Sequence, residues 1–266
     1  MTEDTVIDYR VADLLGEWKL LTGASDSPKL DCPLILAEIL GRSRTWLLAH
    51  DDKAVNHAAV QAFRRNLARR AEGEPLAYIT GRREFWSLDR KVTRDTLIPR
   101  PETELLVETA IAMLGPGPAV VADLGTGCGA IALALARERP AWQVIATDMD
   151  SRTLRVARDN ADRLGLEDSM SFVLADWCKG LPDTAFDLLV SNPPYIDPDD
   201  HHVDDLRYEP RHALVAPKEG LADLDAIVAG ARRCLKAGGL LLLEHGYNQQ
   251  DRVHDLLLAA GFVDIR

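Results

Sequence analysis

Apolar residues in the first part of the chain recur at helical spacing between Thr5 and about Ala71. Side chains three or four positions apart lie on one face of a helix, so each apolar stripe indicates an amphipathic helix. Polar breaks at 23–28, 41–43 and 51–52 separate three such stripes. The pattern predicts a small helical domain in residues 1–80. Its stripes are Val11, Leu14, Leu15, Trp18 and Leu21; then Leu34, Ile35, Ile39 and Leu40; then Val60, Phe63 and Leu67.

The spacing changes after Gly73. Short strand-like apolar pieces, at 85–88 and then at Val92, Leu97 and Ile98, are interrupted by polar residues. Pro101 can begin a helix, because the missing N–H of proline costs nothing in the first turn, where Glu102 and Glu104 are also favourable. We therefore expect residues 81–100 to form a strand-containing linker between two domains.

Apolar strands alternate with helices from residue 118 onward. The expected strands are AVVADLG, WQVIATD, SFVLAD, FDLLVSN and GLLLLEH, and the expected helices are 130–139, 151–164, 221–235 and 249–260. Strands that alternate with helices of ten or more residues imply a mostly parallel sheet with helices on both faces. The sequence thus predicts an α/β, Rossmann-like domain in residues 101–266.

Composition excludes several classes of protein. The chain has 266 residues, of which 47% are apolar and 27% charged, as in ordinary globular proteins. No apolar run approaches the length of a membrane helix, and MTEDTVIDYR has acids where a signal peptide needs a basic start. The four cysteines form no CxxC pair, so we expect reduced thiols and no metal site. The predicted location is the cytoplasm, without membrane binding.

The negative charge is unevenly distributed. The net charge is −11, yet residues 1–90 hold 13 basic and 14 acidic side chains, which leaves 18 and 28 for residues 91–266. An acidic domain disfavours salt-driven attraction to nucleic acid. We expect a small ligand or a basic protein partner. The acidic stretch 197–205 is a candidate for attracting such a partner, and its simpler interpretation is a solvated loop.

A glycine-rich loop follows the first strand of the α/β domain. It reads Asp123-Leu124-Gly125-Thr126-Gly127-Cys128-Gly129 and leads into a helix. Glycines allow a sharp turn and a close approach to a ligand, and the amides of a helix start can face that ligand. The loop indicates a nucleotide-binding site, although Gly125-x-Gly127-x-x-Ala130 also fits the dinucleotide fingerprint, and turn glycines are the simplest alternative.

Acidic residues end the next two strands. Asp148 can accept hydrogen bonds from both hydroxyls of a ribose, or alternatively cap a helix, whereas Asp150 is the better candidate for the cap. Asp176 can bind the exocyclic amine of an adenine, with Trp177 over the base. A surface loop explains the second pair almost as well.

Ser191-Asn192-Pro193-Pro194-Tyr195 ends the fourth strand. Two prolines lack N–H groups, so the strand must stop there. The side-chain oxygen of Asn192 and the carbonyl of Pro193 can accept both hydrogens of a planar NH2 group, and Tyr195 offers an aromatic face. Such a site suits an amide, an adenine or a cytosine.

The glycine loop, Asp148 and Asn192-Pro193-Pro194-Tyr195, in that order, resemble the class I S-adenosylmethionine-dependent N-methyltransferases. Further stretches resemble release factor glutamine methyltransferases (the PrmC/HemK family) over about residues 75–262. These are YITGRREFW at 78–86, LIPRPETE at 97–104, Tyr208-Glu209-Pro210 with Ala213-Leu214, and Glu244-His245-Gly246.

This resemblance implies N5-methylation of the glutamine in the Gly-Gly-Gln motif of bacterial-type peptide chain release factors, with S-adenosyl-L-methionine as the cofactor. It implies a helical substrate-recognition domain before the methyltransferase domain. Residues 99–103 are expected to shape the cofactor pocket. The implied cofactor-binding residues are Gly125, Thr126, Gly127, Gly129, Asp148, Trp177 and Asn192. The implied substrate-binding residues are Asn192, Pro193, Pro194 and Tyr195, with Asn192, Pro193 and Tyr195 also catalytic.

Two features depart from the family pattern. Cys128 stands where the family often has serine, and the sequence stops at Arg266, so we expect the final antiparallel hairpin strand to be missing or truncated and the sheet edge to be exposed. The expected reaction is an in-line displacement by the glutamine nitrogen, on a monomeric enzyme without direct nucleic-acid binding.

Three other functions fit parts of the sequence. A DNA or RNA adenine-N6 methyltransferase needs the same acceptors at residues 192–195, but it also needs a basic groove. A nucleotide-binding interaction module needs only the glycine loop, and an NAD oxidoreductase needs a hydride-transfer site that we do not recognise here. Both leave residues 192–195 unexplained.

Overall fold

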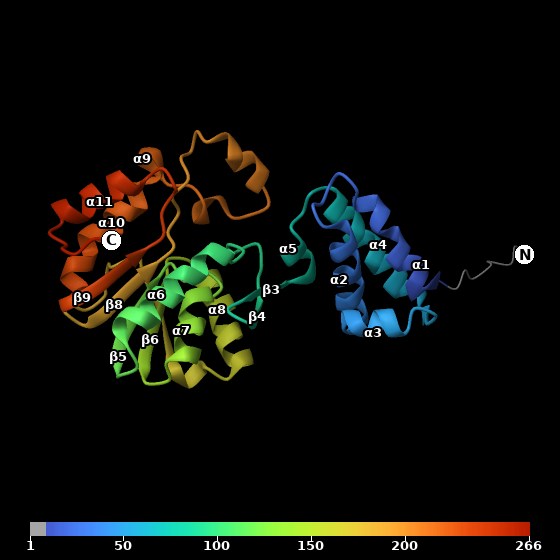
Figure 1. Ribbon diagram of the computed structural model, residues 1–266, viewed down its shortest axis with the longest axis horizontal. Helices are drawn as coiled ribbons and strands as arrows, with labels where there is room; N and C mark the ends of the chain where they lie inside the picture. The colour runs from blue at the N-terminus through green and yellow to red at the C-terminus, as the bar shows by residue number, and fades with distance from the viewer. Residues whose placement is uncertain (1–8) are drawn as a thin grey trace, which may run out of the picture. The chain divides into compact units, whose positions relative to one another are not determined.

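The computed structural model describes residues 9–266, apart from the side chains of His202, Asp204 and Asp205. The predicted helical residues 5–8 and these three side chains of the acidic stretch therefore lie outside the described residues. The chain divides into two compact units, of which the first ends at Gly81 and the second begins at Arg82 (Figure 1).

The first unit is a bundle of short helices. Its elements are β1 (Tyr9–Arg10), α1 (Val11–Leu15), the 3-10 helix η1 (Gly16–Leu21), α2 (Pro28–Leu40), α3 (Arg44–Ala49), β2 (Ala54–Val55), α4 (His57–Ala71) and α5 (Leu76–Thr80). The predicted stripes meet in one core, where Leu14, Ile35 and Phe63 are fully buried. The first stripe is not one α-helix, because the backbone tightens to 3-10 geometry from Gly16, a residue of low helix propensity.

The second unit opens with a hairpin of β3 (Arg82–Phe85) and β4 (Leu88–Lys91). The prediction of a further strand-like piece at Val92, Leu97 and Ile98 is wrong, because the strand stops at Lys91. The N–H of Ile98 donates to the Glu209 carboxylate at 3.2 Å instead of to a neighbouring strand. Pro101 begins a helical turn as predicted.

A five-stranded parallel sheet forms the centre of the second unit, in the order β7-β6-β5-β8-β9. The predicted strands and helices are all present, with ends shifted by a few residues. The short elements η3, η4, η5 and α9 were not predicted. The elements from residue 101 onward are η2 (Pro101–Thr103), α6 (Glu104–Leu114), β5 (Ala119–Leu124), α7 (Ala130–Glu138), β6 (Trp142–Asp148), α8 (Ser151–Leu164), η3 (Glu167–Ser169), β7 (Met170–Leu174), β8 (Phe186–Ser191), η4 (His201–Leu206), η5 (Arg211–Ala213), α9 (Pro217–Gly220), α10 (Ala222–Cys234), β9 (Leu235–Leu243) and α11 (Gln250–Ala259).

Helices bury both faces of this sheet. Val121 of β5 faces α6 and α7 in one core, whereas its neighbour Ala122 faces α10 in another. Figure 1 shows α10 and α11 on one side of the sheet and α6, α7 and α8 on the other. Burial on both sides explains why these strands are continuously apolar rather than alternating.

The sheet ends at β9, which pairs only with β8 among the described residues. Residues 260–266 form no strand. Among the described helices, none combines the length and the apolar character needed to cross a membrane.

Candidate active site

The strand order reverses between β5 and β8. Successive strands after β5 add on one side as β6 and β7, and the next two add on the other side as β8 and β9. A crevice opens at the carboxyl ends of the strands on either side of such a switch point. The glycine loop follows β5 and Asn192 follows β8, so the fold brings the two strongest sequence signals to one crevice.

The glycine loop uses its glycines for different reasons. Gly125, Gly127 and Gly129 all have positive φ, at 73°, 60° and 86°. A Cβ on Gly125 would lie 2.9 Å from the Trp177 ring, and a Cβ on Gly129 would lie 2.9 Å from Leu133. Gly125 and Gly127 line the crevice, but Gly129 does not. The structure therefore shows that Gly129 makes room for the packing of Leu133 of α7 and Ala157 of α8.

Asp123, at the end of β5, holds the glycine loop by hydrogen bonds. Its Oδ2 accepts hydrogen bonds from the Thr126 hydroxyl at 2.7 Å and from the Ala132 N–H at 3.1 Å. Its Oδ1 has no hydrogen-bond partner among the described residues. Burial raises the pKa of Asp123 to about 7, and the bonds from Thr126 and Ala132 only partly oppose this.

Asp148 ends β6 and ties the loop to it. Its Oδ2 accepts from the Gly127 N–H at 3.2 Å, and its Oδ1 accepts from the Asp150 N–H at 3.0 Å. A carboxylate has about four acceptor positions, so two remain for a ligand. Burial raises the pKa of Asp148. Asp150 caps α8 as predicted, by accepting from the Arg152 N–H.

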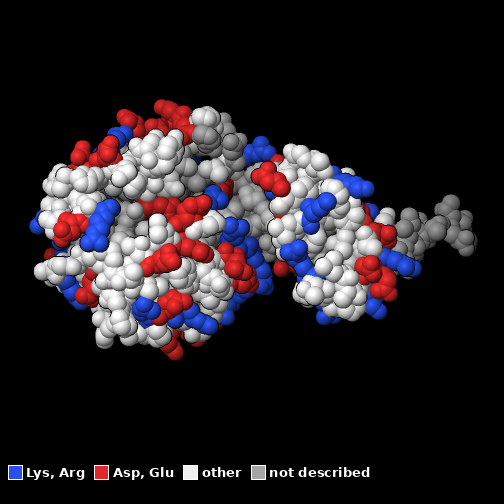
Figure 2. All heavy atoms as spheres, viewed as in Figure 1, with Lys and Arg blue, Asp and Glu red and all other residues white. Residues whose placement is uncertain are grey.

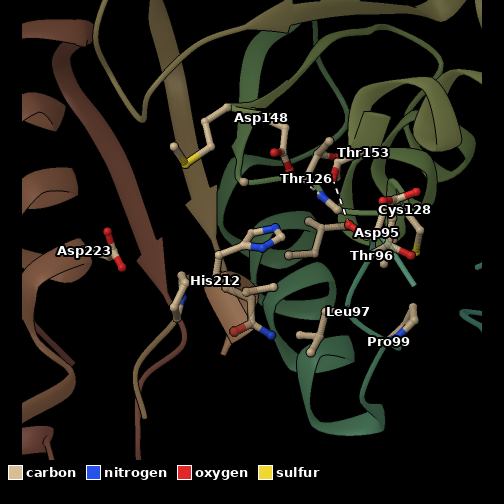
Figure 3. Close-up of a pocket in the computed structure, with 18 of the residues that line it drawn as sticks. Asp95, Thr96, Leu97, Pro99, Thr126, Cys128, Asp148, Thr153, His212 and Asp223 are labelled. Carbon is tan, nitrogen blue, oxygen red and sulfur yellow. Dashed lines mark hydrogen bonds between the residues drawn. The ribbon is translucent and has the colours of Figure 1, made fainter. Parts of the chain in front are cut away.

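These residues line a crevice with an open volume of about 960 Å³. Four segments form its walls: residues 95–103, the glycine loop, the ends of β6 and β7, and residues 192–213. Figure 3 shows that His212 points into the middle of this pocket, while Asp223 lies on its far side. The pocket lining combines carboxylates, backbone groups of a glycine loop and an aromatic ring, which are the groups that bind a nucleoside derivative.

Trp177 lines the same crevice beside the glycine loop. Its indole N–H donates to Asp223 Oδ1 at 3.1 Å, and its ring packs against Gly125. Asp176 also lines the crevice, and its carboxylate pairs with Lys179 at 2.6 Å in an exposed setting. The ring of Trp177 is thus fixed by two contacts, whereas Asp176 is held by a surface ion pair of little energetic weight.

A second pocket, with an open volume of about 520 Å³, lies behind Asn192. Asn192 and Pro194 line both pockets, whereas Pro193 and Tyr195 line only the second. The two pockets also share Leu97, Arg100 and Ala213. The structure therefore brings Asn192 to the boundary between a large cavity on the glycine side and a smaller one on the tyrosine side.

The Asn192 side chain is held by a hydrogen-bond chain. Its Nδ2 donates to Thr103 Oγ1 at 2.9 Å, and that hydroxyl donates to Glu244 Oε2 at 2.7 Å. The Tyr195 hydroxyl donates to the other oxygen of Glu244 at 3.3 Å. Burial raises the pKa of Glu244, and burial with the nearby Glu244 carboxylate raises the pKa of Tyr195 to about 12.

Two further contacts fix the backbone around the second pocket. Glu209 is buried and accepts from Arg100 at 2.5 Å as well as from the Ile98 N–H. Gln249 donates to the carbonyl of Tyr195 at 3.0 Å. A Cβ on Gly220 would lie 2.0 Å from that same carbonyl oxygen, so only glycine fits there.

Several of these side chains received no role from the sequence alone. Glu209 and Glu244 lie in stretches that carry the family resemblance, but their partners are far away in the chain. His212, Asp223 and Asp123 gave no signal beyond their residue type. Their positions follow from loops that meet only in the folded sheet.

Two family models match separate parts of the chain. Residues 14–81 match the PrmC N-terminal domain family, and residues 101–208 match the methyltransferase small domain family. A crystal structure of the ribosomal protein L11 methylase from Lactobacillus delbrueckii subsp. bulgaricus aligns with a TM-score of 0.49 at 20% identity, over 65% of this chain and 76% of that one.

Curated relatives match over nearly the whole chain. The release factor glutamine methyltransferase of Escherichia coli (strain K12) is 44% identical over 91% of this chain and 88% of its own length. The protein of that name from Vibrio cholerae is 45% identical, over 93% of this chain and 87% of its own length. The protein of that name from Yersinia pestis is 47% identical, over 90% of this chain and 86% of its own length. The chain belongs to the release factor glutamine methyltransferase family.

Proposed function

We propose that this protein transfers a methyl group from S-adenosyl-L-methionine to the N5 amide nitrogen of the glutamine in the Gly-Gly-Gln motif of bacterial-type peptide chain release factors. The observation that carries the proposal is the meeting of two pockets at Asn192. A methyltransferase needs one site for the methyl donor and one for the acceptor, with a shared boundary where the reacting atoms meet. Family membership supports the choice of acceptor.

The larger pocket fits S-adenosyl-L-methionine. Asp148 has free acceptor positions for ribose hydroxyls, Trp177 offers a fixed aromatic face, and Asp176 can accept from an amine. Gly127 leaves open space where a side chain would stand, and a Cβ there would meet nothing within 4 Å. We assign Gly125, Thr126 and Gly127 to the methionine part of the cofactor. When bound, the cofactor supplies an electrophilic methyl group on a sulfonium centre.

The smaller pocket fits the side chain of glutamine. Because Nδ2 of Asn192 is engaged with Thr103, Oδ1 is the end that remains for a ligand. Together with the carbonyl of Pro193 it accepts both hydrogens of the substrate NH2 group, which orients the nitrogen. Both acceptors also favour the partial positive charge that develops on this nitrogen. Tyr195 adds an aromatic wall held by Glu244.

The helical unit is proposed to dock the release factor. We assign residues 1–80 to substrate recognition, 81–100 to a linker and 101–266 to catalysis. The match of residues 14–81 to a domain family of its own supports a separate role. Hydrophobic side chains on the surface of this unit include Leu20 and Leu48, which are 64% and 73% exposed.

An adenine amine would satisfy the same two acceptors, so methylation of DNA or RNA is the competing function. The charge of the second unit argues against it. Residues 82–266 contain 21 Lys and Arg against 30 Asp and Glu, a net charge of −9. Figure 2 shows acidic side chains over much of the face of this unit that is turned to the viewer. Such a surface repels a phosphate backbone.

A labelling competition tests the proposed function. The full chain receives S-adenosylmethionine with a labelled methyl group together with a release factor, its variant with Gln→Ala in the Gly-Gly-Gln motif, and a DNA duplex. We expect label only on the unaltered release factor. Label on the duplex, or equal label on the variant, would show that the acceptor is something else.

A further inference from the structure

An asparagine at a methyl-transfer site has two chemically opposite ends. The Oδ1 end accepts hydrogen bonds from a substrate NH2 group, whereas the Nδ2 end donates and would repel it. A rotation of the amide by half a turn exchanges the two ends with almost no change in shape. Something in the protein must therefore choose which end of Asn192 faces the substrate pocket.

The choice is made by the last member of the hydrogen-bond chain. An ionised carboxylate can only accept, so the Thr103 hydroxyl gives its hydrogen to Glu244 Oε2 at 2.7 Å. The Thr103 oxygen is then free only to accept, and Asn192 must present Nδ2 to it, at 2.9 Å. Oδ1 points away from Thr103 as a consequence.

Burial keeps this chain from being replaced by water. Thr103 is only 4% exposed, and Asn192 and Glu244 are half-buried. The backbone is tied as well, because the N–H of Glu244 donates to the carbonyl of Ser191 at 3.0 Å, directly before Asn192. Hydrogen bonds in such a setting polarise one another, so a negative charge at Glu244 also makes Oδ1 a stronger acceptor.

The titratable groups around Glu244 come from two segments, the loop after β8 and residues 100–102. Tyr195 donates to its Oε1 from the loop after β8, Glu102 of η2 repels it, and Arg100 lies near the Tyr195 hydroxyl. Burial raises the pKa of Glu244, with hydrogen bonds from Thr103, Tyr195 and Asn192 opposing the rise. Both oxygens of Glu244 accept hydrogen bonds, from Thr103 and from Tyr195, as an ionised carboxylate does. Its pKa lies above the ordinary pKa of a glutamate.

We propose that Thr103 and ionised Glu244 are positioning residues, which fix the Asn192 amide with its oxygen toward the substrate amide nitrogen. This inference rests on the proposed function and names two residues through which it acts. Protonation of Glu244 removes the constraint, because a carboxylic acid can donate to Thr103. The Thr103 hydroxyl can then donate to Asn192 Oδ1, and the NH2 end turns toward the substrate.

Four variants of the full chain test the roles of these two residues. Thr103→Val removes the hydroxyl at constant shape, Thr103→Ser keeps the hydroxyl, and Glu244→Gln removes the charge but keeps an acceptor. We expect kcat on the release factor to fall by about tenfold or more in Thr103→Val and in Glu244→Gln, with Thr103→Ser close to wild type. The dissociation constant for S-adenosylmethionine should change by less than about threefold. Thr109→Val, on α6, serves as the matched control and should keep wild-type turnover.

The pH profile at saturating cofactor separates positioning from simple structural support. Wild type should lose kcat on the acid side in one step that belongs to Glu244, and Glu244→Gln should lack this step. An unchanged acid limb in Glu244→Gln, or full turnover in Thr103→Val, would overturn the proposal.

A second readout does not depend on the substrate. The side-chain NH2 signals of Asn192 in a ¹⁵N–¹H spectrum, identified by their absence in Asn192→Ala, should shift with that same titration step in wild type and not in Glu244→Gln. Asn192 signals whose positions do not change with pH in wild type would overturn the positioning role of Thr103 and Glu244. A wild-type enzyme that labels no release factor while these signals titrate would refute the proposed function alone.

Discussion

Asn192 lies where the two pockets of the second unit meet, and we propose that it contacts both cofactor and substrate. It lines both pockets, and its Nδ2 donates to Thr103, which lines the first pocket. In the proposed function, the glycine loop and Asp148 bind the methyl donor, and the pocket lined by Tyr195 receives the acceptor. At the residue scale, we therefore expect two oxygens to hold the substrate NH2 group during methyl transfer.

Replacement of Asn192 by alanine should therefore damage turnover far more than cofactor binding. We expect kcat to fall by at least about 100-fold, the size of effect seen when one group that stabilises developing charge is removed. Cofactor affinity should stay within about threefold, because the glycine loop, Asp148 and Trp177 remain. Single-turnover methylation and calorimetric titration with S-adenosylhomocysteine measure the two quantities, and unchanged turnover would contradict the role of Asn192.

The raised pKa of Asp123 should make the stability of the protein depend on pH. Its pKa is raised from 3.8 to about 7 in the folded protein, so the folded state holds a proton that the unfolded state releases. Its contribution to the free energy of unfolding therefore falls as pH rises between about 4 and 7 and is constant above. Asp123→Asn should gain stability relative to wild type across this range, as measured by urea unfolding. A stability difference independent of pH would contradict the assignment.

At the element scale, one buried arginine is among the residues that attach the hairpin β3–β4 to the rest of the second unit. Arg90 is 0% exposed and donates to the carbonyls of Phe85 and Leu88 in the hairpin and of Ala130 at the start of α7. Burial lowers the pKa of Arg90 to about 10. Arg90 thereby links the hairpin to the first residue of α7, the helix that follows the glycine loop.

Arg90→Ala should destabilise the second unit by about 3 kcal/mol, because three buried carbonyls lose a donor and a cavity remains. Arg83→Ala, on the exposed side of the same hairpin, is the matched control and should change stability by less than about 0.5 kcal/mol. Urea unfolding gives the free energies, and hydrogen exchange of peptides that cover residues 82–91 shows where protection is lost. Equal effects of the two substitutions would rule out a special role for Arg90.

Regular elements were predictable because each depends on its own residues. The strands β5, β6 and β8 are apolar on both faces, and the helices between them have clear amphipathic spacing, so their order along the chain specified a parallel sheet. The segment 92–100 was not predictable. Its Ile98 N–H and Arg100 bind Glu209, more than a hundred residues away, and no local pattern reveals such a partner.

The same reason limited the prediction of the site. Asp148 and residues 192–195 were recognisable because they end predicted strands, and parallel strands end at one edge. Thr103 and Glu244 lie 141 residues apart, and each is an ordinary polar residue until η2 and the end of β9 meet beside Asn192. Gly129 also belongs to the binding motif, and its lack of a side chain leaves room for Leu133, a packing contact that the motif did not predict.

At the scale of the whole molecule, a helical unit precedes an acidic sheet domain. The stretch 197–205 contributes to this charge, and Asp197 already uses one carboxylate oxygen to hold the Asp199 N–H. An acidic rim should accelerate encounters with a basic face of the substrate protein, and salt should weaken this effect.

Methylation at low release factor concentration should therefore slow as salt rises. Replacement of Asp197, Asp199 and Asp200 by asparagine keeps the local hydrogen-bonding groups and should flatten that dependence. Glu167→Gln together with Asp168→Asn, in η3, is the control for a change of net charge elsewhere. Identical salt dependence in wild type and the triple variant would mean that the stretch is only solvated.

The most direct test of the account is to locate the methyl group on the product. The purified chain is incubated with S-adenosylmethionine and a release factor, and the product is fragmented by tandem mass spectrometry. One methyl group on the side-chain nitrogen of the Gly-Gly-Gln glutamine, absent when Asn192→Ala replaces wild type, is the predicted result. A methyl group on any other residue, or an equal yield from the variant, would contradict the claim that the pockets meeting at Asn192 carry out this transfer.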